Sequence, residues 1–171
     1  ALLYGKTAFT LPKDIGLSQT AAQEFIDAYF PGYPSLRAFI HKILADARAT
    51  GVVRTISGRR RLVPELTSKN GAIRAAADRE TVNMPIQGTA ADVLKKAMID
   101  VHAALGRFNA GRRQPSRMIL TVHDELVFEA PDDDAPEVMS LVKSSMEQAY
   151  PLSVPLTVDV GVGVNWNEAK P

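Results

Sequence analysis

Three polar residues separate two short apolar segments late in the chain, and this pattern constrains the fold more than any other. Residues 118–122 (Met-Ile-Leu-Thr-Val) and 126–128 (Leu-Val-Phe) are each typical of a buried strand. Only His123, Asp124 and Glu125 lie between them. We therefore expect a tight hairpin with two carboxylates at its tip.

The hairpin tip is a candidate metal site. Tight hairpins usually turn on Gly or Asn, whereas two carboxylates between core strands bring charge repulsion and desolvation costs. A bound divalent cation offsets both, and oxygen ligands suit Mg²⁺, which takes one or two carboxylates plus substrate phosphates. Because neighbouring strand residues point to opposite sides, we expect one of Asp124 and Glu125 to be the primary ligand and the other a supporting acid. His123 can donate a hydrogen bond to a phosphate. The alternative is an ordinary solvent-exposed polar turn, which the three residues alone do not exclude.

The first part of the chain predicts a helix that ends near a Pro-Gly pair. Thr20 and Gln23 have the spacing of a capping box, and Ser18 is an alternative cap. We expect this helix to end at about Phe30, where Pro31-Gly32 follows.

A second helix and a basic hairpin should come next. The helix is amphipathic, with Ser35 as its expected cap and Gly51 at its end, where a left-handed residue is favoured. Residues 52–56 predict a short strand, which Ser57-Gly58 turns into a basic return arm over residues 59–63.

The remaining segments predict helix, hairpin, helix and strand. A helix over residues 71–82 should break near Pro85, and a longer helix should span residues 89–105. A further helix follows the hairpin through residues 138–146, and residues 156–162 are the expected final strand. Helices combined with antiparallel strands predict the α+β fold class.

Charge is unevenly distributed in a chain whose net charge is only +1. Residues 48–79 are rich in Arg and Lys and contain only two acidic residues, Glu65 and Asp78. Residues 124–147 are predominantly acidic. A basic zone beside an acidic one suits a protein that binds a polyanion and holds cations nearby, although solvated faces of unrelated elements give the same pattern.

Composition excludes two classes of site and one class of protein. The chain has no cysteine, which excludes a disulfide framework and a thiolate zinc site. No apolar run approaches the roughly 20 residues that a membrane span needs, so we expect no membrane partner.

Five segments, in order, resemble motifs of the family A DNA polymerases. They are Leu3-Tyr4-Gly5 (end of the nucleotide-binding helix), Gly58–Arg61 with Val63-Pro64 (basic hairpin of the fingers), Asn83–Asp92 (start of the long palm helix), Thr121–Val127 (third palm motif) and Val158–Trp166 (final palm strand and tail). The resemblance covers essentially the whole chain, and the Asn83–Asp92 segment is highly specific.

The resemblance implies the C-terminal part of such a polymerase, with residues 1–85 in the fingers subdomain and residues 86–171 in the palm. It implies template-directed transfer of a nucleotide from dNTP to a primer 3′-hydroxyl, in DNA replication and repair, with two Mg²⁺ ions. Primer-template DNA, dNTP and the upstream part of the same polymerase are the implied partners, in the bacterial cytoplasm at the nucleoid. The second metal-binding aspartate and the triphosphate-binding residues should lie upstream of Ala1, so we expect this chain alone to be inactive.

The resemblance also implies a role for each matching residue. Asp124 matches a metal-binding catalytic aspartate, Glu125 its less essential catalytic neighbour, and His123 a residue that contacts the primer terminus. Tyr4 and Gly5 match the template and nucleotide site.

The remaining matches are DNA contacts. Arg79, Asn83 and Gln87 match residues along the minor groove of the new duplex, and their spacing of four places them on one helix face if the helix continues to Pro85. Arg61 matches a contact with the template backbone.

Four other functions fit some of these features. They are a non-catalytic nucleic-acid-binding module of the same fold, a magnesium-dependent nuclease, a purely structural helical domain, and an RNA polymerase of the single-subunit phage type. The first of these predicts strongly salt-dependent DNA binding with no requirement for Asp124 in the intact polymerase.

Overall fold

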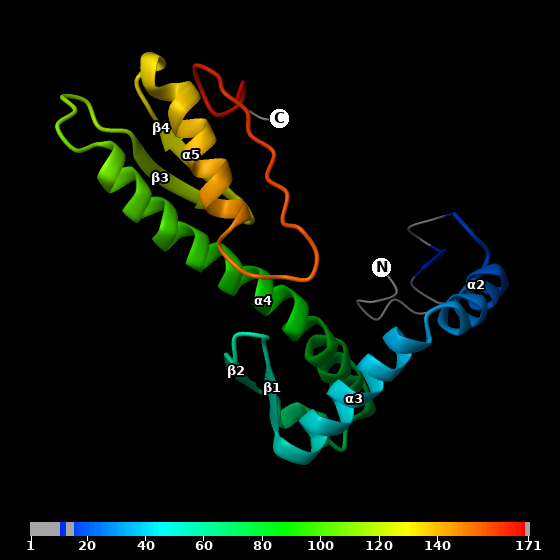
Figure 1. The fold of residues 1–171 in the computed structure, drawn as a ribbon. Coiled ribbons are helices and arrows are strands. Elements are labelled where there is room, and N and C mark those ends of the chain that lie inside the picture. Colours follow the sequence, from blue (N-terminus) through cyan, green and yellow to red (C-terminus); the bar gives the residue numbers. More distant parts are fainter. Residues whose placement is uncertain (1–10, 13–15, 170–171) are drawn as a thin grey trace. The chain divides into compact units, whose positions relative to one another are not determined.

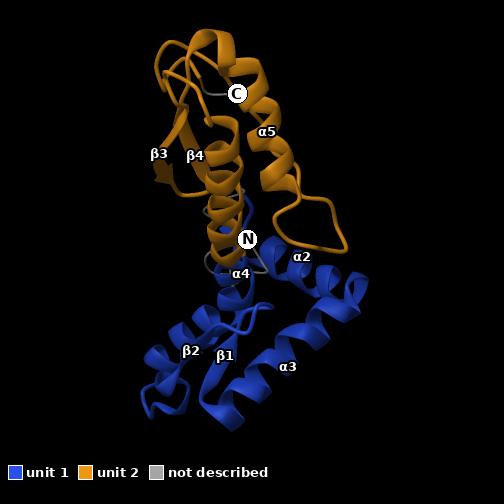
Figure 2. Ribbon diagram, turned by 60° about the vertical axis from the view of Figure 1, so that its left-hand side comes forward, with its two compact units in different colours: residues 1–89 blue, residues 90–171 orange. Residues whose placement is uncertain are grey.

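The computed structural model describes residues 11–12 and 16–169, so Tyr4 and Gly5 lie outside the described residues. The chain divides into two compact units, residues 1–89 (unit 1) and residues 90–171 (unit 2), coloured separately in Figure 2. Helices and two separate antiparallel hairpins make up the described elements, which confirms the α+β class (Figure 1).

Unit 1 begins with two consecutive helices, α2 (Gln19–Gly32) and α3 (Pro34–Thr50). Ser18 is the N-cap of α2, and its hydroxyl accepts a hydrogen bond from the Ala21 N–H at 3.1 Å, so the alternative cap is the one observed. The expected end at Phe30 is two residues early, because α2 includes Pro31. A proline in the last turn removes only one backbone donor, which limits its cost there.

The start and the end of α3 follow different rules. Pro34 is its first residue and no side chain caps it, so the expected cap at Ser35 is wrong. Proline suits this position because its φ is already helical and its missing N–H would be unpaired. At the other end, the Gly51 prediction is confirmed: its φ is 70° and its N–H donates to the Ala47 carbonyl at 2.8 Å.

The basic hairpin is present and shorter than predicted. Strand β1 (Val52–Arg54) pairs antiparallel with β2 (Arg60–Leu62), and a short 3₁₀ helix, η2 (Pro64–Thr67), follows. One cluster of buried side chains joins the hairpin, α3, η2 and the start of the next helix: Ala47, Val53, Val63, Leu66 and Ala77. This cluster fixes the basic arm to the surrounding helices.

A single long helix, α4 (Gly71–Phe108), replaces the two helices predicted on either side of Pro85. The expected break is wrong, and contacts just beyond the proline give a physical reason. The Thr89 hydroxyl accepts a hydrogen bond from the Ile56 N–H at 3.2 Å, and Gly88 packs against Thr55. These contacts stabilise the residues after Pro85 in their helical positions and offset the lost backbone bond. The boundary between the two units falls within α4.

Unit 2 contains the end of α4, the predicted hairpin and one further α-helix. Strand β3 (Arg117–Val122) pairs antiparallel with β4 (Glu125–Glu129), with an irregularity between Met118 and Leu120, and η3 (Asp132–Asp134) leads into α5 (Ala135–Glu147). Val101 and Leu105 of α4 pack with Val138 and Val142 of α5, and Met118 and Phe128 of the hairpin border that cluster. The hairpin is therefore supported on one face by two helices.

The predicted final strand over residues 156–162 is wrong, because the described segment after α5 forms no strand. Its alternation is nevertheless visible: Leu156, Val158 and Val160 are half-buried, and the residues between them are exposed. The Val158 N–H donates to the Glu147 carboxylate at 3.1 Å, and the sheet of unit 2 contains only β3 and β4 among the described residues. An alternating segment becomes a strand only when a neighbouring strand accepts its backbone hydrogen bonds.

No helix in the described part of the chain combines the length and the apolar character required to cross a membrane.

Candidate functional site

The tip of the unit 2 hairpin is one residue tighter than predicted. Val122 pairs with Glu125, which is the first residue of β4, so only His123 and Asp124 form the loop. His123 has a φ of 54°, and it is the one non-glycine residue with positive φ among the residues that the structure describes. Two-residue hairpin loops require such a left-handed residue and usually use Gly or Asn. A histidine in that position is consistent with a functional role for its side chain.

All three tip side chains are exposed. The expected desolvation cost at Asp124 and Glu125 is therefore absent, because both carboxylates are exposed to solvent. Exposed carboxylates suit Mg²⁺, which usually keeps several waters and binds through one or two carboxylates. The donor set fits this ion in part only: no group of three or more His, Asp or Glu side chains able to hold a metal occurs in residues 11–12 and 16–169.

The three predicted minor-groove residues lie on one side of α4, in unit 1. Because α4 continues through Pro85, the spacing of four between Arg79, Asn83 and Gln87 places them on a common face. Arg79 and Gln87 are exposed. Asn83 is half-buried, and its Oδ1 atom is buried without a hydrogen-bond partner in the described structure. Such unsatisfied groups are uncommon, and a bound ligand is one way to satisfy them.

Arg61, the predicted template contact, lies on β2 and forms an ion pair with Glu80 of α4. Sequence reasoning missed Glu80. The two residues are 19 positions apart and belong to different elements, so no helical or strand spacing connects them. A second pair of this kind joins Arg48 of α3 to Asp78 of α4 at 2.5 Å. Acids of α4 thus neutralise two arginines of the predicted basic zone.

The predicted site residues are divided between the two units. Arg61, Arg79, Asn83 and Gln87 belong to unit 1, and His123, Asp124 and Glu125 belong to unit 2. Within unit 1, the basic hairpin and α4 are directly connected through Arg61 and Glu80 and through Ile56 and Thr89.

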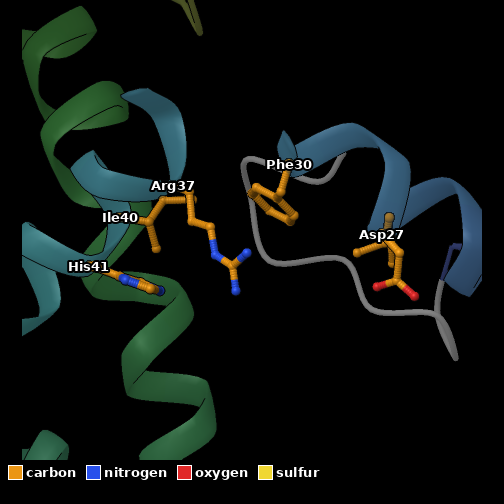
Figure 3. A pocket seen from close by; sticks show the side chains of 6 residues that line it. Asp27, Phe30, Arg37, Ile40 and His41 are labelled. Atoms are coloured by element: carbon orange, nitrogen blue, oxygen red, sulfur yellow. The ribbon is translucent and has the colours of Figure 1, made fainter. Parts of the chain in front are cut away.

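An open hollow lies between α2 and α3, as Figure 3 shows. Asp27 and Phe30 of α2 border it, together with Arg37, Ile40 and His41 of α3. Two charged side chains border it, Asp27 and Arg37. Both are exposed, and they do not form an ion pair with each other. We assign no chemistry to this hollow.

Comparisons with known proteins agree over nearly the whole chain. A family model described as DNA polymerase family A matches residues 1–168. The chain is 47% identical over 169 residues to "DNA polymerase I, thermostable" of Thermus filiformis, covering 99% of this chain and 20% of that protein. It is 45% identical over 168 residues to DNA polymerase I of Pseudomonas aeruginosa, covering 98% of this chain and 18% of that protein.

A solved structure shares the fold. The POL domain of Pol1 from M. smegmatis, in complex with DNA primer-template and dNTP, superimposes with a TM-score of 0.88 and 42% sequence identity. The alignment covers 98% of this chain and 29% of that one. The chain thus spans about a fifth of the length of the curated relatives.

Proposed function

Because this chain belongs to DNA polymerase family A, we propose that it takes part in template-directed DNA synthesis, in which a nucleotide is transferred from dNTP to a primer 3′-hydroxyl. The family match over residues 1–168 is the observation that carries this proposal. The M. smegmatis relative, which binds DNA primer-template and dNTP, supports the same two partners here.

The hairpin tip supplies the acidic part of the proposed active site. Asp124 would hold Mg²⁺, and Glu125 would support it from the start of β4. When bound, Mg²⁺ stabilises negative charge on the attacking and leaving oxygens of phosphoryl transfer. His123 carries its imidazole on a fixed two-residue turn, which positions it to donate a hydrogen bond at the primer terminus.

The common face of α4 supplies proposed contacts with the new duplex. Asn83 and Gln87 carry amide donors that suit the acceptors of the minor groove, which are nearly the same for all base pairs. Arg79 adds a positive charge on the same face, and Arg61 is the proposed contact with a template phosphate. Such contacts test the geometry of a base pair without reading its sequence.

The subdomains are proposed from the same comparison. We place residues 1–85 in the fingers and residues 86–171 in the palm, and the compact units, which divide after Thr89, support a boundary in this region. Because the chain spans about a fifth of its curated relatives, we propose that it works within a longer polymerase at the bacterial nucleoid. The second metal-binding aspartate and the triphosphate-binding residues then belong to the remainder, and the 171-residue chain alone is inactive.

Primer extension with Mg²⁺ tests the proposal directly. The longer polymerase and the 171-residue chain are each assayed as wild type and as Asp124→Ala, with Asp133→Ala as a control that removes an exposed acid outside the tip. We expect the longer polymerase to extend primers, Asp124→Ala to abolish extension, Asp133→Ala to retain it, and the short chain to be silent.

Two outcomes contradict different parts of the proposal. Extension by the 171-residue chain alone would show that it needs no metal-binding or triphosphate-binding residues from outside this chain. Full activity of Asp124→Ala in the longer polymerase would show that the hairpin tip is not the metal site. If that variant also binds DNA normally, the chain is better described as a nucleic-acid-binding module.

A further inference from the structure

We propose that Glu80 competes with DNA for Arg61, so that a DNA phosphate must displace an intramolecular ion pair before Arg61 can bind it. This inference rests on the proposed function, because it assumes that unit 1 contacts primer-template DNA. It adds a residue, Glu80, that limits DNA affinity and makes no favourable contact with DNA itself.

The contact between Arg61 and Glu80 is a direct one. The Arg61 Nη2 atom donates to the Glu80 Oε2 atom, which connects β2 to α4 within unit 1. The two side chains are 50% and 59% exposed, so water and any polyanion can reach both. Exposed ion pairs of this kind stabilise a protein only weakly, which makes the pair easy to exchange.

Two other arginines of unit 1, Arg60 on β2 and Arg79 on α4, are exposed, and neither forms an ion pair within the described part of the chain. Arg48 is paired with Asp78, but Arg48 is not among the proposed DNA contacts. Of the proposed phosphate and groove contacts, Arg61 is therefore the one whose charge is already neutralised in the structure described.

Exchange of the ion pair has two costs. Arg61 must leave Glu80, and the freed carboxylate then lies close to the phosphate that Arg61 binds, where like charges repel. Both costs arise from electrostatic interactions between solvent-exposed groups, so salt should reduce them. Removal of the Glu80 charge should accordingly tighten DNA binding most at low ionic strength.

The test is the affinity of the longer polymerase for a fluorescently labelled primer-template duplex, measured by anisotropy without Mg²⁺ or dNTP over a range of salt concentrations. The variants are Glu80→Gln, Arg61→Gln and the double variant. Glu65→Gln is the matched control, because it removes the same charge from an exposed position in unit 1 that forms no ion pair with an arginine in the described part of the chain. Gln and Glu have similar helix propensities, so Glu80→Gln should leave α4 intact.

We expect Glu80→Gln to lower the Kd by about two- to five-fold at low salt, the range that an exposed ion pair can supply, with a smaller effect at high salt. Arg61→Gln should weaken binding, and Glu80→Gln should have no effect in the Arg61→Gln background. Glu65→Gln should bind as the wild type does.

Three results overturn the inference. Unchanged affinity of Glu80→Gln, while Arg61→Gln weakens binding, would leave the proposed function in place and remove the role of Glu80. Equal tightening with and without Arg61, or in Glu65→Gln, would show a general charge effect. Failure of the wild-type polymerase to bind the duplex would contradict the proposed function itself.

Discussion

Gly88 lies so close to Thr55 that a Cβ atom at Gly88 would stand 2.8 Å from the Thr55 Cγ2 atom. Thr55 cannot easily move aside. It is 5% exposed, its N–H donates to the Arg59 carbonyl at 3.0 Å, and its hydroxyl accepts from the Arg59 N–H at 3.1 Å. A helical glycine is thus used here for close approach between α4 and the basic hairpin, and not for a turn.

Gly88→Ala should therefore destabilise unit 1, although alanine is the better helix former. Overpacking of a close contact typically costs about 1–3 kcal/mol, which exceeds the roughly 0.4–1 kcal/mol gained from Gly→Ala in a helix. Gly106→Ala is the control, because Gly106 lies in the same helix with no heavy atom within 4 Å of its Cβ position. Urea denaturation followed by circular dichroism should show a loss for Gly88→Ala and a small gain for Gly106→Ala. A gain in stability in both variants would show that the basic hairpin moves aside at Thr55 without a cost.

Features set by neighbouring residues could be predicted from the sequence. Gly51 ends α3 with positive φ, and the two hairpins form between the segments that the apolar pattern indicates. These outcomes depend on the local conformational preferences of a few consecutive residues.

Features that depend on distant partners could not be predicted in this way. Pro85 is tolerated because Thr89 and Gly88 contact the basic hairpin, and Glu80 is a site residue only because β2 lies beside α4. Residues 156–162 alternate as a strand does, but without a strand partner in the described structure they form none. In each case the structure is decided by the presence or absence of a contact between residues distant in the sequence. Local periodicity does not indicate such contacts.

The loop between α4 and β3 is closed by one side chain, that of Asn109. Its Nδ2 atom donates to the Ser116 carbonyl at 2.8 Å, and its Oδ1 atom accepts from the Ser116 N–H at 2.9 Å. Ser116 is 2% exposed, so removal of the amide leaves two buried backbone groups without partners. Asn109→Ala should cost about 2 kcal/mol. Asn109→Asp keeps the acceptor but places a carboxylate oxygen against the Ser116 carbonyl, so it should cost at least as much.

Hydrogen exchange at Ser116 distinguishes this clamp from a general weakening of unit 2. Exchange should accelerate in Asn109→Ala and remain slow in Gln114→Ala, which changes an exposed residue of the same loop. Equal protection in both variants would contradict the role of Asn109.

Arg112 joins the same loop to the start of α5. Its guanidinium lies 3.8 Å from the centroid of the Phe108 ring, and its Nη1 and Nη2 atoms approach Asp134 at 2.5 Å and Glu137 at 3.5 Å. Arg112→Lys keeps the charge and loses the planar fork, so it should cost about 1 kcal/mol. The neighbouring exposed Arg113 has no such contacts in the described structure, and Arg113→Lys should change the midpoint of urea unfolding little. Equal effects of the two substitutions would contradict this assignment.

His123 allows the backbone and the side chain at the hairpin tip to be tested separately. Its φ of 54° is unfavourable for most L-residues and favourable for glycine, so His123→Gly should be as stable as wild type or up to about 1 kcal/mol more stable. His102→Gly, at an exposed position within α4, should instead lose about 1 kcal/mol. In the longer polymerase, His123→Gly should reduce primer extension by roughly ten- to a hundred-fold, because one hydrogen bond to a charged group is lost. A stable His123→Gly variant that extends primers at the wild-type rate would show that the histidine serves only the turn. A variant that is both stable and slow would show that the imidazole is kept for synthesis, at a position where the backbone alone favours glycine.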